Sequence, residues 1–349
     1  MRLKYIDILK GFAIFLVVFG HVIVYQSQMA RLIFSFHMPL FFIISGYLFN
    51  FKKYENNFSQ FFKGRFRRLI LPYFTSVLLF FMYYLIYMSP KPFIETPSAA
   101  ILFLLKNDIV SSLYGSGAIN NFHITPVGPL WFLVALFCVE ILFYFSLKLM
   151  KNSSVLQKYI FYFIISYSGV IIGQKIFLPW SFDISLVAII FVFAGYELRK
   201  QNIIEKISAL PNNIYLLIIL ISCILWYILS KHSFLCMSDR VYHNYFYIYI
   251  EVILASVVLF SLCYKIQNIQ YFSSINKMFS FLGSETLIIL IMHFRVFINT
   301  PQWSILRYND LIFTIYIILF SLMIGLVIKQ IPLLKNIYYP NINKKKEEQ

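Results

Sequence analysis

Long blocks of apolar residues recur along this chain of 349 residues and decide what it can fold into. A helix that crosses about 30 Å of hydrocarbon needs roughly 20 residues. The blocks do not alternate apolar with polar residues, which excludes a transmembrane β-barrel. We therefore predict an all-α polytopic membrane protein whose ten spans cover residues 8–26, 32–50, 69–88, 127–149, 158–177, 183–199, 212–230, 245–264, 279–298 and 311–329.

The composition agrees with a membrane protein. Charged residues make up 13% of the chain and hydrophobic residues 60%, whereas soluble domains carry about a quarter charged residues. We predict one integral membrane domain over residues 1–340, with a loop at 89–126 on the outer side and a disordered charged tail at 341–349. The four cysteines lie apart, mostly within apolar blocks, and are interpreted as buried small hydrophobes.

The net charge of +16 follows from the topology of the chain. Ten spans place both termini on one side of the membrane. If that side is cytoplasmic, 22 of the 30 Lys and Arg residues lie in cytoplasmic segments, as the positive-inside rule requires. This asymmetry supports both the number of spans and their orientation, and it requires no nucleic acid as partner.

Three histidines lie within the predicted spans, where an ionisable side chain is costly and indicates a functional site. His21 follows Lys10 by eleven residues, so their side chains lie about 16 Å apart along one helix and within about 20° of one face. His37 opens the second span, and the short turn before it places it at a depth similar to that of His21. His293 lies in the outer half of the ninth span. Each histidine could instead be structural, bonded to backbone or to a lipid headgroup.

A second group of residues suits a phosphate ligand. Arg65 and Arg68 are three residues apart, which places two guanidinium groups on one helical face. This basic run could equally anchor the chain to anionic lipid. Glu140 lies within the fourth span and needs a partner or a proton. Asp7, three residues before Lys10, is interpreted as its ion-pair partner.

These motifs resemble those of the membrane-bound acyltransferase-3 family, and particularly the branch of fucose 4-O-acetylase. The similar stretches, spread over most of the chain, are Asp7-x-x-Lys10-Gly, His21, Phe36-His-Met-Pro-Leu-Phe-Phe-x-x-Ser-Gly-Tyr47, Arg65-x-x-Arg68-x-x-x-Pro72, Gly128-Pro-Leu-Trp-Phe-Leu, Leu178-Pro-Trp-Ser-Phe-Asp183 and His293. The chain departs from the family at one position. Some relatives carry a Glu five residues after the Trp of the fourth span, where this chain has Leu136, and Glu140 is not equivalent by position.

The resemblance implies an O-acetyltransferase in a plasma (inner) membrane of bacterial type. It would move acetyl from cytoplasmic acetyl-CoA to a sugar hydroxyl of a surface polysaccharide or of its lipid-linked precursor. Besides membrane lipid as a partner, the resemblance leaves open a homo-oligomer or a polysaccharide assembly complex. The candidate catalytic residues are His21, His37, His293 and Glu140, and the candidate acetyl-CoA ligands are Lys10, Arg65 and Arg68.

The spacing along the first span fits this chemistry. A separation of about 16 Å is about the length of an extended pantetheine arm, so a thioester anchored at Arg65 and Arg68 would reach His21. There a neutral imidazole could act as general base or carry the acetyl group briefly. The main alternative is a transporter or flippase for a lipid-linked sugar, with the histidines as proton relay. A non-catalytic scaffold and, less favoured, a three-histidine metal site remain as further alternatives; we expect no metal.

Overall fold

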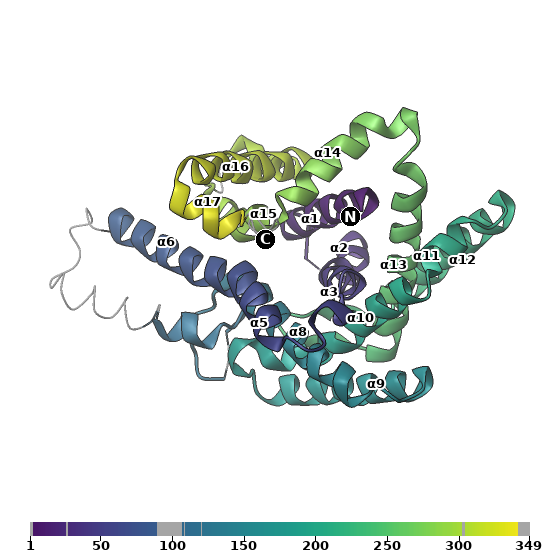
Figure 1. Ribbon diagram of the computed structural model, residues 1–349. Coiled ribbons are helices and arrows are strands. Elements are labelled where there is room, and N and C mark those ends of the chain that lie inside the picture. Colours follow the sequence, from purple (N-terminus) through teal and green to yellow (C-terminus); the bar gives the residue numbers. More distant parts are fainter. Residues whose placement is uncertain are drawn as a thin grey trace, which may run out of the picture.

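The computed structural model describes residues 3–25, 27–88, 107, 109–119, 121–301 and 304–340, which are almost entirely helical (Figure 1). The α-helices are α1 (Lys4–Val22), α2 (Gln28–Phe34), α3 (His37–Tyr47), α4 (Phe51–Tyr54), α5 (Phe58–Arg65), α6 (Leu71–Met88), α8 (Trp131–Leu149), α9 (Val155–Lys175), α10 (Phe182–Lys200), α11 (Ile203–Ser208), α12 (Asn212–Ser230), α13 (Tyr245–Ile266), α14 (Ser273–Ser284), α15 (Thr286–Asn299), α16 (Asp310–Gln330) and α17 (Pro332–Tyr338). The remaining elements are η1 (Phe66–Ile70), η2 (Gly128–Leu130), η3 (Pro179–Ser181), η4 (Gln270–Phe272), η5 (Ile305–Tyr308) and the strands β1 (Phe234–Cys236) and β2 (Val241–His243).

The expectation of an all-α polytopic membrane protein is confirmed. Within the described residues, nine helical segments are long and apolar enough to cross a membrane, and a bent pair of helices makes a tenth. The second of them runs over α2 and α3, from Gln28 to Tyr47, and so begins and ends earlier than predicted. Most of the predicted outer loop and the whole predicted tail lie outside the described residues.

The third span corrects the predicted position of the basic run. We expected the run Lys63–Arg68 to precede a span at 69–88, but α5, η1 and α6 form one continuous segment from Phe58 to Tyr83. The segment changes to a π-helical turn at η1, a local irregularity that often accompanies functional sites. Arg65 can lie within a helix of this kind because a carboxylate pairs with it, as described below.

The ninth span is bent, whereas a straight helix at 279–298 was expected. α14 and α15 meet at an angle of 79°, and the carboxylate of Glu285 at the bend accepts hydrogen bonds from Lys329 at 2.7 Å and Tyr339 at 2.5 Å. α14 then packs closely on α1: a Cβ atom at Gly11 would lie 1.8 Å from the Phe279 carbonyl oxygen. Because of the bend, α14 packs on α1 near Gly11, and α15 places His293 beside His21 farther along α1.

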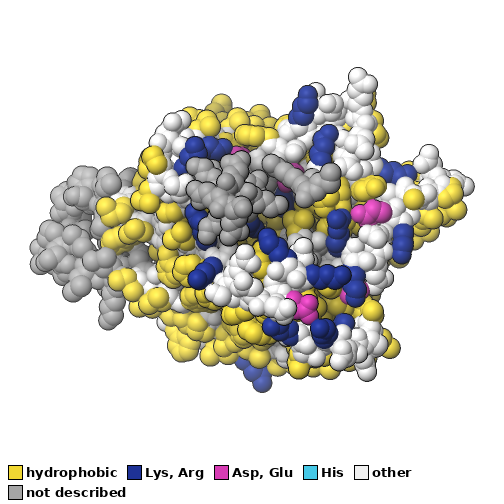
Figure 2. Space-filling model, viewed as in Figure 1, with side chains coloured by type: hydrophobic (Ala, Val, Ile, Leu, Met, Phe, Trp, Pro, Cys, Tyr) yellow, Lys and Arg dark blue, Asp and Glu magenta, His cyan; other side chains and the backbone are white. Residues whose placement is uncertain are grey.

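Helices α1, α3, α8 and α10 form the buried centre of the protein. Many of their apolar residues are buried, and Leu9, Leu40 and Val134 have no exposed surface. Helix α12 lies at the periphery and exposes apolar side chains such as Leu216 and Leu220, as expected of a helix in contact with lipid. Figure 2 shows many Lys and Arg side chains and few Asp and Glu on one face of the molecule.

A short β-hairpin between α12 and α13 was not predicted. β1 and β2 pair antiparallel, with Leu235 opposite Tyr242. Just before β2, Arg240 donates hydrogen bonds to Asp183 at the start of α10, with Nε 2.8 Å from Oδ2, and both side chains are buried. This ion pair fixes the turn of the hairpin against the helical core.

Candidate active site

The helices α1, α3 and α8 line two cavities, one toward each of their ends. The first cavity, of about 290 Å³, is called the histidine cavity, and the second, of about 480 Å³, the basic cavity. To the histidine cavity the three helices contribute Val17, Gly20 and His21 (α1), His37 and Met38 (α3) and Trp131 (α8). To the basic cavity they contribute Lys10 (α1), Phe41, Ile44 and Ser45 (α3) and Phe132, Leu136 and Glu140 (α8).

The structure brings the three predicted histidines together in the histidine cavity. The rings of His21 and His293 lie with their centroids 5.3 Å apart and their planes at 32°. His37 and His293 are buried, whereas His21 has an exposed side chain that faces the cavity. His21 is therefore the histidine that a substrate in the cavity can contact most readily.

Backbone carbonyls fix the proton positions on two of these rings. Nδ1 of His37 lies 2.9 Å from the Ile33 carbonyl oxygen, and Nδ1 of His293 lies 2.9 Å from that of Ile289. A carbonyl oxygen only accepts, so each Nδ1 carries the proton and each neutral ring keeps its lone pair on Nε2. In the described structure Nε2 of His293 is buried and has no hydrogen-bond partner. It is thus available to a neighbouring donor.

The hairpin turn supplies a group of polar residues that sequence reasoning missed. Ser238 and Asp239 line the histidine cavity, and the carboxylate of Asp239 interacts electrostatically with His21. Cys236 donates to Asp239 over 3.2 Å. Burial, together with the nearby carboxylate, raises the pKa of the Cys236 thiol to about 12. The thiol is therefore neutral at pH 7 and is not a nucleophile.

The basic cavity brings together the three predicted acetyl-CoA ligands Lys10, Arg65 and Arg68 and adds Lys53. Four cations and one carboxylate leave the charged side chains of its lining with three net positive charges. The guanidinium group of Arg65 also lies over the ring of Phe61, with its Cζ atom 5.2 Å from the ring centroid. Such a lining suits a ligand with several phosphate charges.

Glu140 lies in the basic cavity, away from the histidines with which it was grouped. Its Oε2 is 3.0 Å from Nε of Arg65, and its Oε1 accepts a hydrogen bond from Ser45 at 2.5 Å. The partner that the sequence required is therefore Arg65. The expected pair of Asp7 and Lys10 is also present, with 4.0 Å between Oδ1 and Nζ.

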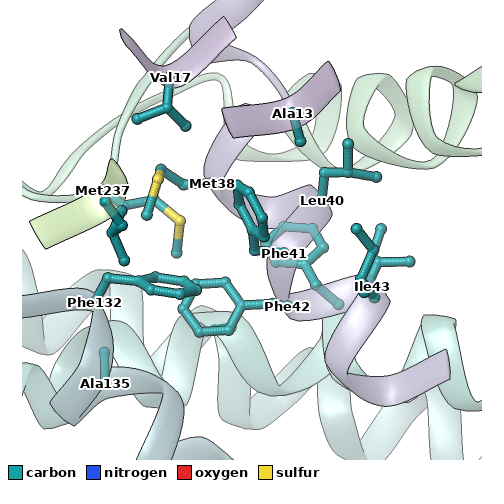
Figure 3. Close-up of a cluster of buried hydrophobic side chains, with 14 of the residues drawn as sticks. Ala13, Val17, Met38, Leu40, Phe41, Phe42, Ile43, Phe132, Ala135 and Met237 are labelled. Atoms are coloured by element: carbon teal, nitrogen blue, oxygen red, sulfur yellow. The ribbon is translucent and has the colours of Figure 1, made fainter. Parts of the chain in front are cut away.

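An apolar cluster separates the two cavities. Figure 3 shows Met38, Phe41 and Phe132 between α1 and α8, with Val17 above them, and the rings of Phe41 and Phe132 have their centroids 5.9 Å apart. Phe41 and Phe132 line the basic cavity, and Val17 and Met38 line the histidine cavity. All four side chains are buried. A flexible chain that joined the two cavities would pass through this cluster.

A comparison with family models matches residues 3–329 to an acyltransferase domain, that of the acyltransferase-3 family. No curated protein and no solved structure matches the chain. The match covers all the helices that line the two cavities, and it favours acyl transfer over the transporter or scaffold alternatives. The chain belongs to the membrane-bound acyltransferase-3 family and is a multi-pass membrane acyltransferase.

Proposed function

We propose that this acyltransferase moves an acetyl group from cytoplasmic acetyl-CoA to a sugar hydroxyl of a surface polysaccharide or its precursor. The observation that carries the proposal is the placement of the basic cavity and the histidine cavity along the same three helices. One cavity suits the phosphates of the donor, and the other suits proton transfer at the acceptor. The preference for acetyl and the branch of fucose 4-O-acetylase rest on the sequence resemblance.

The donor nucleotide would occupy the basic cavity. Lys10, Arg65 and Arg68 hold its phosphates, and Glu140 holds Arg65 in place through their 3.0 Å contact. A neighbouring cavity shares Leu48 and Asn50 with the basic cavity and adds the cations and rings that a phosphorylated adenosine needs. These are Lys52, Arg199 and Lys200, with Phe51 and Tyr196.

The pantetheine arm would run along α1 from Lys10 toward His21. These residues are eleven positions apart on one continuous helix, or about 16 Å. The arm would displace the side chains of Met38 and Phe41, which lie in the apolar cluster between the two cavities. An apolar passage of this kind excludes water from the thioester until an acceptor is bound.

At the histidine cavity, His21 acts as general base. It takes the proton of the acceptor hydroxyl while the hydroxyl oxygen attacks the thioester carbonyl carbon. The carbon–sulfur bond then breaks, and the proton passes from His21 to the leaving sulfur, which gives the O-acetyl ester and free CoA. During the reaction, Nε2 of His293, which has no hydrogen-bond partner in the described structure, would accept an N–H of His21 and leave the other ring nitrogen of His21 free to act as the base.

The orientation of the protein in the membrane is inferred from the distribution of its Lys and Arg side chains. The face rich in Lys and Arg in Figure 2 is assigned to the cytoplasm, where acetyl-CoA is made. The histidine cavity then opens toward the outer side, where Tyr25, Trp131 and Asp239 form part of its lining. Aromatic rings with a few polar groups suit a sugar, which offers both apolar C–H faces and hydroxyl groups.

The proposal is tested by His21→Ala, with His232→Ala as matched control. His232 is an exposed loop histidine after α12 and lines neither cavity. Mass spectrometry of cell-surface glycans should show the acetyl mass with the wild type and the control, and a loss of about a hundredfold or more with His21→Ala. Acetylation at the wild-type rate by a folded, inserted His21→Ala protein would contradict the role of His21.

A further inference from the structure

A further cavity lies to the side of the histidine cavity, with a smaller cavity between the two. It has a volume of about 320 Å³ and lies between α6, the segment before α8 and α15. Its apolar lining includes Val77, Phe80 and Phe81. A small cavity next to it shares Phe80 and Arg295 with it, and shares Phe294 and Gly128 with the histidine cavity. The three cavities thus adjoin one another in series, and the two that lie farther from the histidines are together called the lateral groove.

Arg295 lies where the lateral groove approaches the histidines. It is exposed, it follows His293 by two residues on α15, and its Cζ atom is 4.6 Å from the centroid of the Phe80 ring. Cations within membrane-spanning helices are costly and accompany ligand sites. Phe294, which lies between His293 and Arg295 in the sequence, lines both the histidine cavity and the small cavity. An apolar wall, a cation and the candidate base therefore follow one another along the lining of these cavities.

The apolar wall continues on the surface of α6. Leu78 and Met82, on the same helix as Phe80, are 58% and 48% exposed. Figure 1 shows α6 extending away from α1 and α3. A hydrocarbon tail could therefore lie along α6 in the bilayer while its polar end lay in the groove. Polar side chains of Ser111, Ser112 and Thr125 line the groove on its other side.

We propose that the lateral groove binds an acceptor whose saccharide is joined through phosphate to a polyisoprenyl lipid. Arg295 binds the phosphate, Val77 and Phe80 contact the first isoprene units, and the sugar reaches past Phe294 to His21. This inference rests on the proposed function for the identity of the sugar, and it narrows the acceptor to the lipid-linked precursor. A water-soluble polysaccharide would need neither the apolar wall nor a cation at this position.

The test measures lipid binding alone, without acetyl transfer. A negative result therefore counts against the lipid-linked acceptor and not against the proposed acetyltransferase activity. Purified protein is titrated with undecaprenyl phosphate in detergent micelles and followed by native mass spectrometry, with undecaprenol and phosphatidylglycerol as comparison lipids. The variants are Arg295→Gln, Arg295→Lys and, as matched control, Lys231→Gln. Lys231 is likewise an exposed cation over an aromatic ring, 4.5 Å from the centroid of Tyr227, but it lies outside the groove.

We expect undecaprenyl phosphate to bind the wild type and Lys231→Gln equally, and Arg295→Gln about tenfold more weakly or worse. Arg295→Lys should retain part of the affinity because the charge remains. Undecaprenol should bind weakly to all four proteins. Equal binding of undecaprenyl phosphate to wild type and Arg295→Gln, or equal binding of phosphatidylglycerol and undecaprenyl phosphate to the wild type, would overturn the inference. A protein that acetylates glycans but fails this test would retain its proposed function and lose only the lipid-linked acceptor.

Discussion

The imidazole rings of His21 and His293 face each other with their centroids 5.3 Å apart, although they come from the first helix and from one near the end of the chain. The hydrogen bond from Nδ1 of His293 to Ile289 holds one ring in a fixed orientation. His21 has the more accessible side chain of the two. This relationship makes His21 the candidate base and His293 the residue that positions it.

His293→Ala should lower kcat about a hundredfold and leave KM for acetyl-CoA unchanged. The reason is that His293 acts through His21 and lines the histidine cavity, not the basic cavity. His293→Gln, which places an amide near the position of Nε2, should recover part of the loss. The measurement is steady-state acetyl transfer by the purified protein. A rise in KM with kcat intact would assign His293 to substrate binding instead.

Glu140→Ala should lower the free energy of unfolding by about 3 kcal/mol, because it leaves the largely buried Arg65 without its carboxylate. The double variant Arg65→Leu/Glu140→Leu should recover much of this stability and yet bind acetyl-CoA more weakly. Thermal unfolding in detergent and calorimetric titration with acetyl-CoA measure the two effects. If the double variant bound acetyl-CoA like the wild type, Arg65 would not be a phosphate ligand.

The sequence predicted the residues that meet in the histidine cavity better than it predicted the place of Glu140 in the basic cavity. The common depth of the three histidines follows from helix spacing, and the structure places all three in one cavity. The grouping of Glu140 with them ignored a signal in the sequence: Glu140 follows Trp131 by nine residues, about 13.5 Å along the helix. This spacing alone moves it toward the opposite end of the fourth span.

Other features depend on contacts between distant parts of the chain. The position of Asp239 depends on the ion pair of Arg240 with Asp183, which no local pattern indicates. The bend at Glu285 lacks a proline and is held by Lys329 and Tyr339 from the end of the chain. A loop carboxylate in a chain with only 14 acidic residues was the one signal that could have indicated Asp239.

Val17→Phe should obstruct the route between the cavities, since Val17 lies above Met38 in the apolar cluster (Figure 3). We expect free CoA to bind as before, because its phosphates and nucleotide stay in the basic cavity, while kcat for transfer falls at least tenfold. Added volume in a packed core also costs about 1–3 kcal/mol of stability, so thermal unfolding serves as the control. Unchanged kcat in a folded variant would exclude this route for the thioester arm.

Cys236 should react slowly with iodoacetamide at pH 8 and should be dispensable for transfer. Its pKa is raised from the ordinary 9.0 to about 12, and three pK units lower the thiolate fraction about a thousandfold. Because the raised pKa stabilises the protonated thiol in the folded state, its contribution to stability persists below pH 9 and is lost as the pH rises toward 12. Peptide mass spectrometry of alkylated protein measures the rate, and Cys236→Ser should keep wild-type activity. Rapid alkylation or an inactive Cys236→Ser variant would point instead to a thiolate nucleophile.

The most direct test is a cryo-electron microscopy structure with a thioether analogue of acetyl-CoA, which cannot transfer its acyl group. We predict phosphate density beside Arg65 and Arg68, an extended arm that separates Met38 from Phe41, and an acyl group next to His21. Density for the whole analogue at the histidine cavity, or an arm that leads away from His21, would contradict the account.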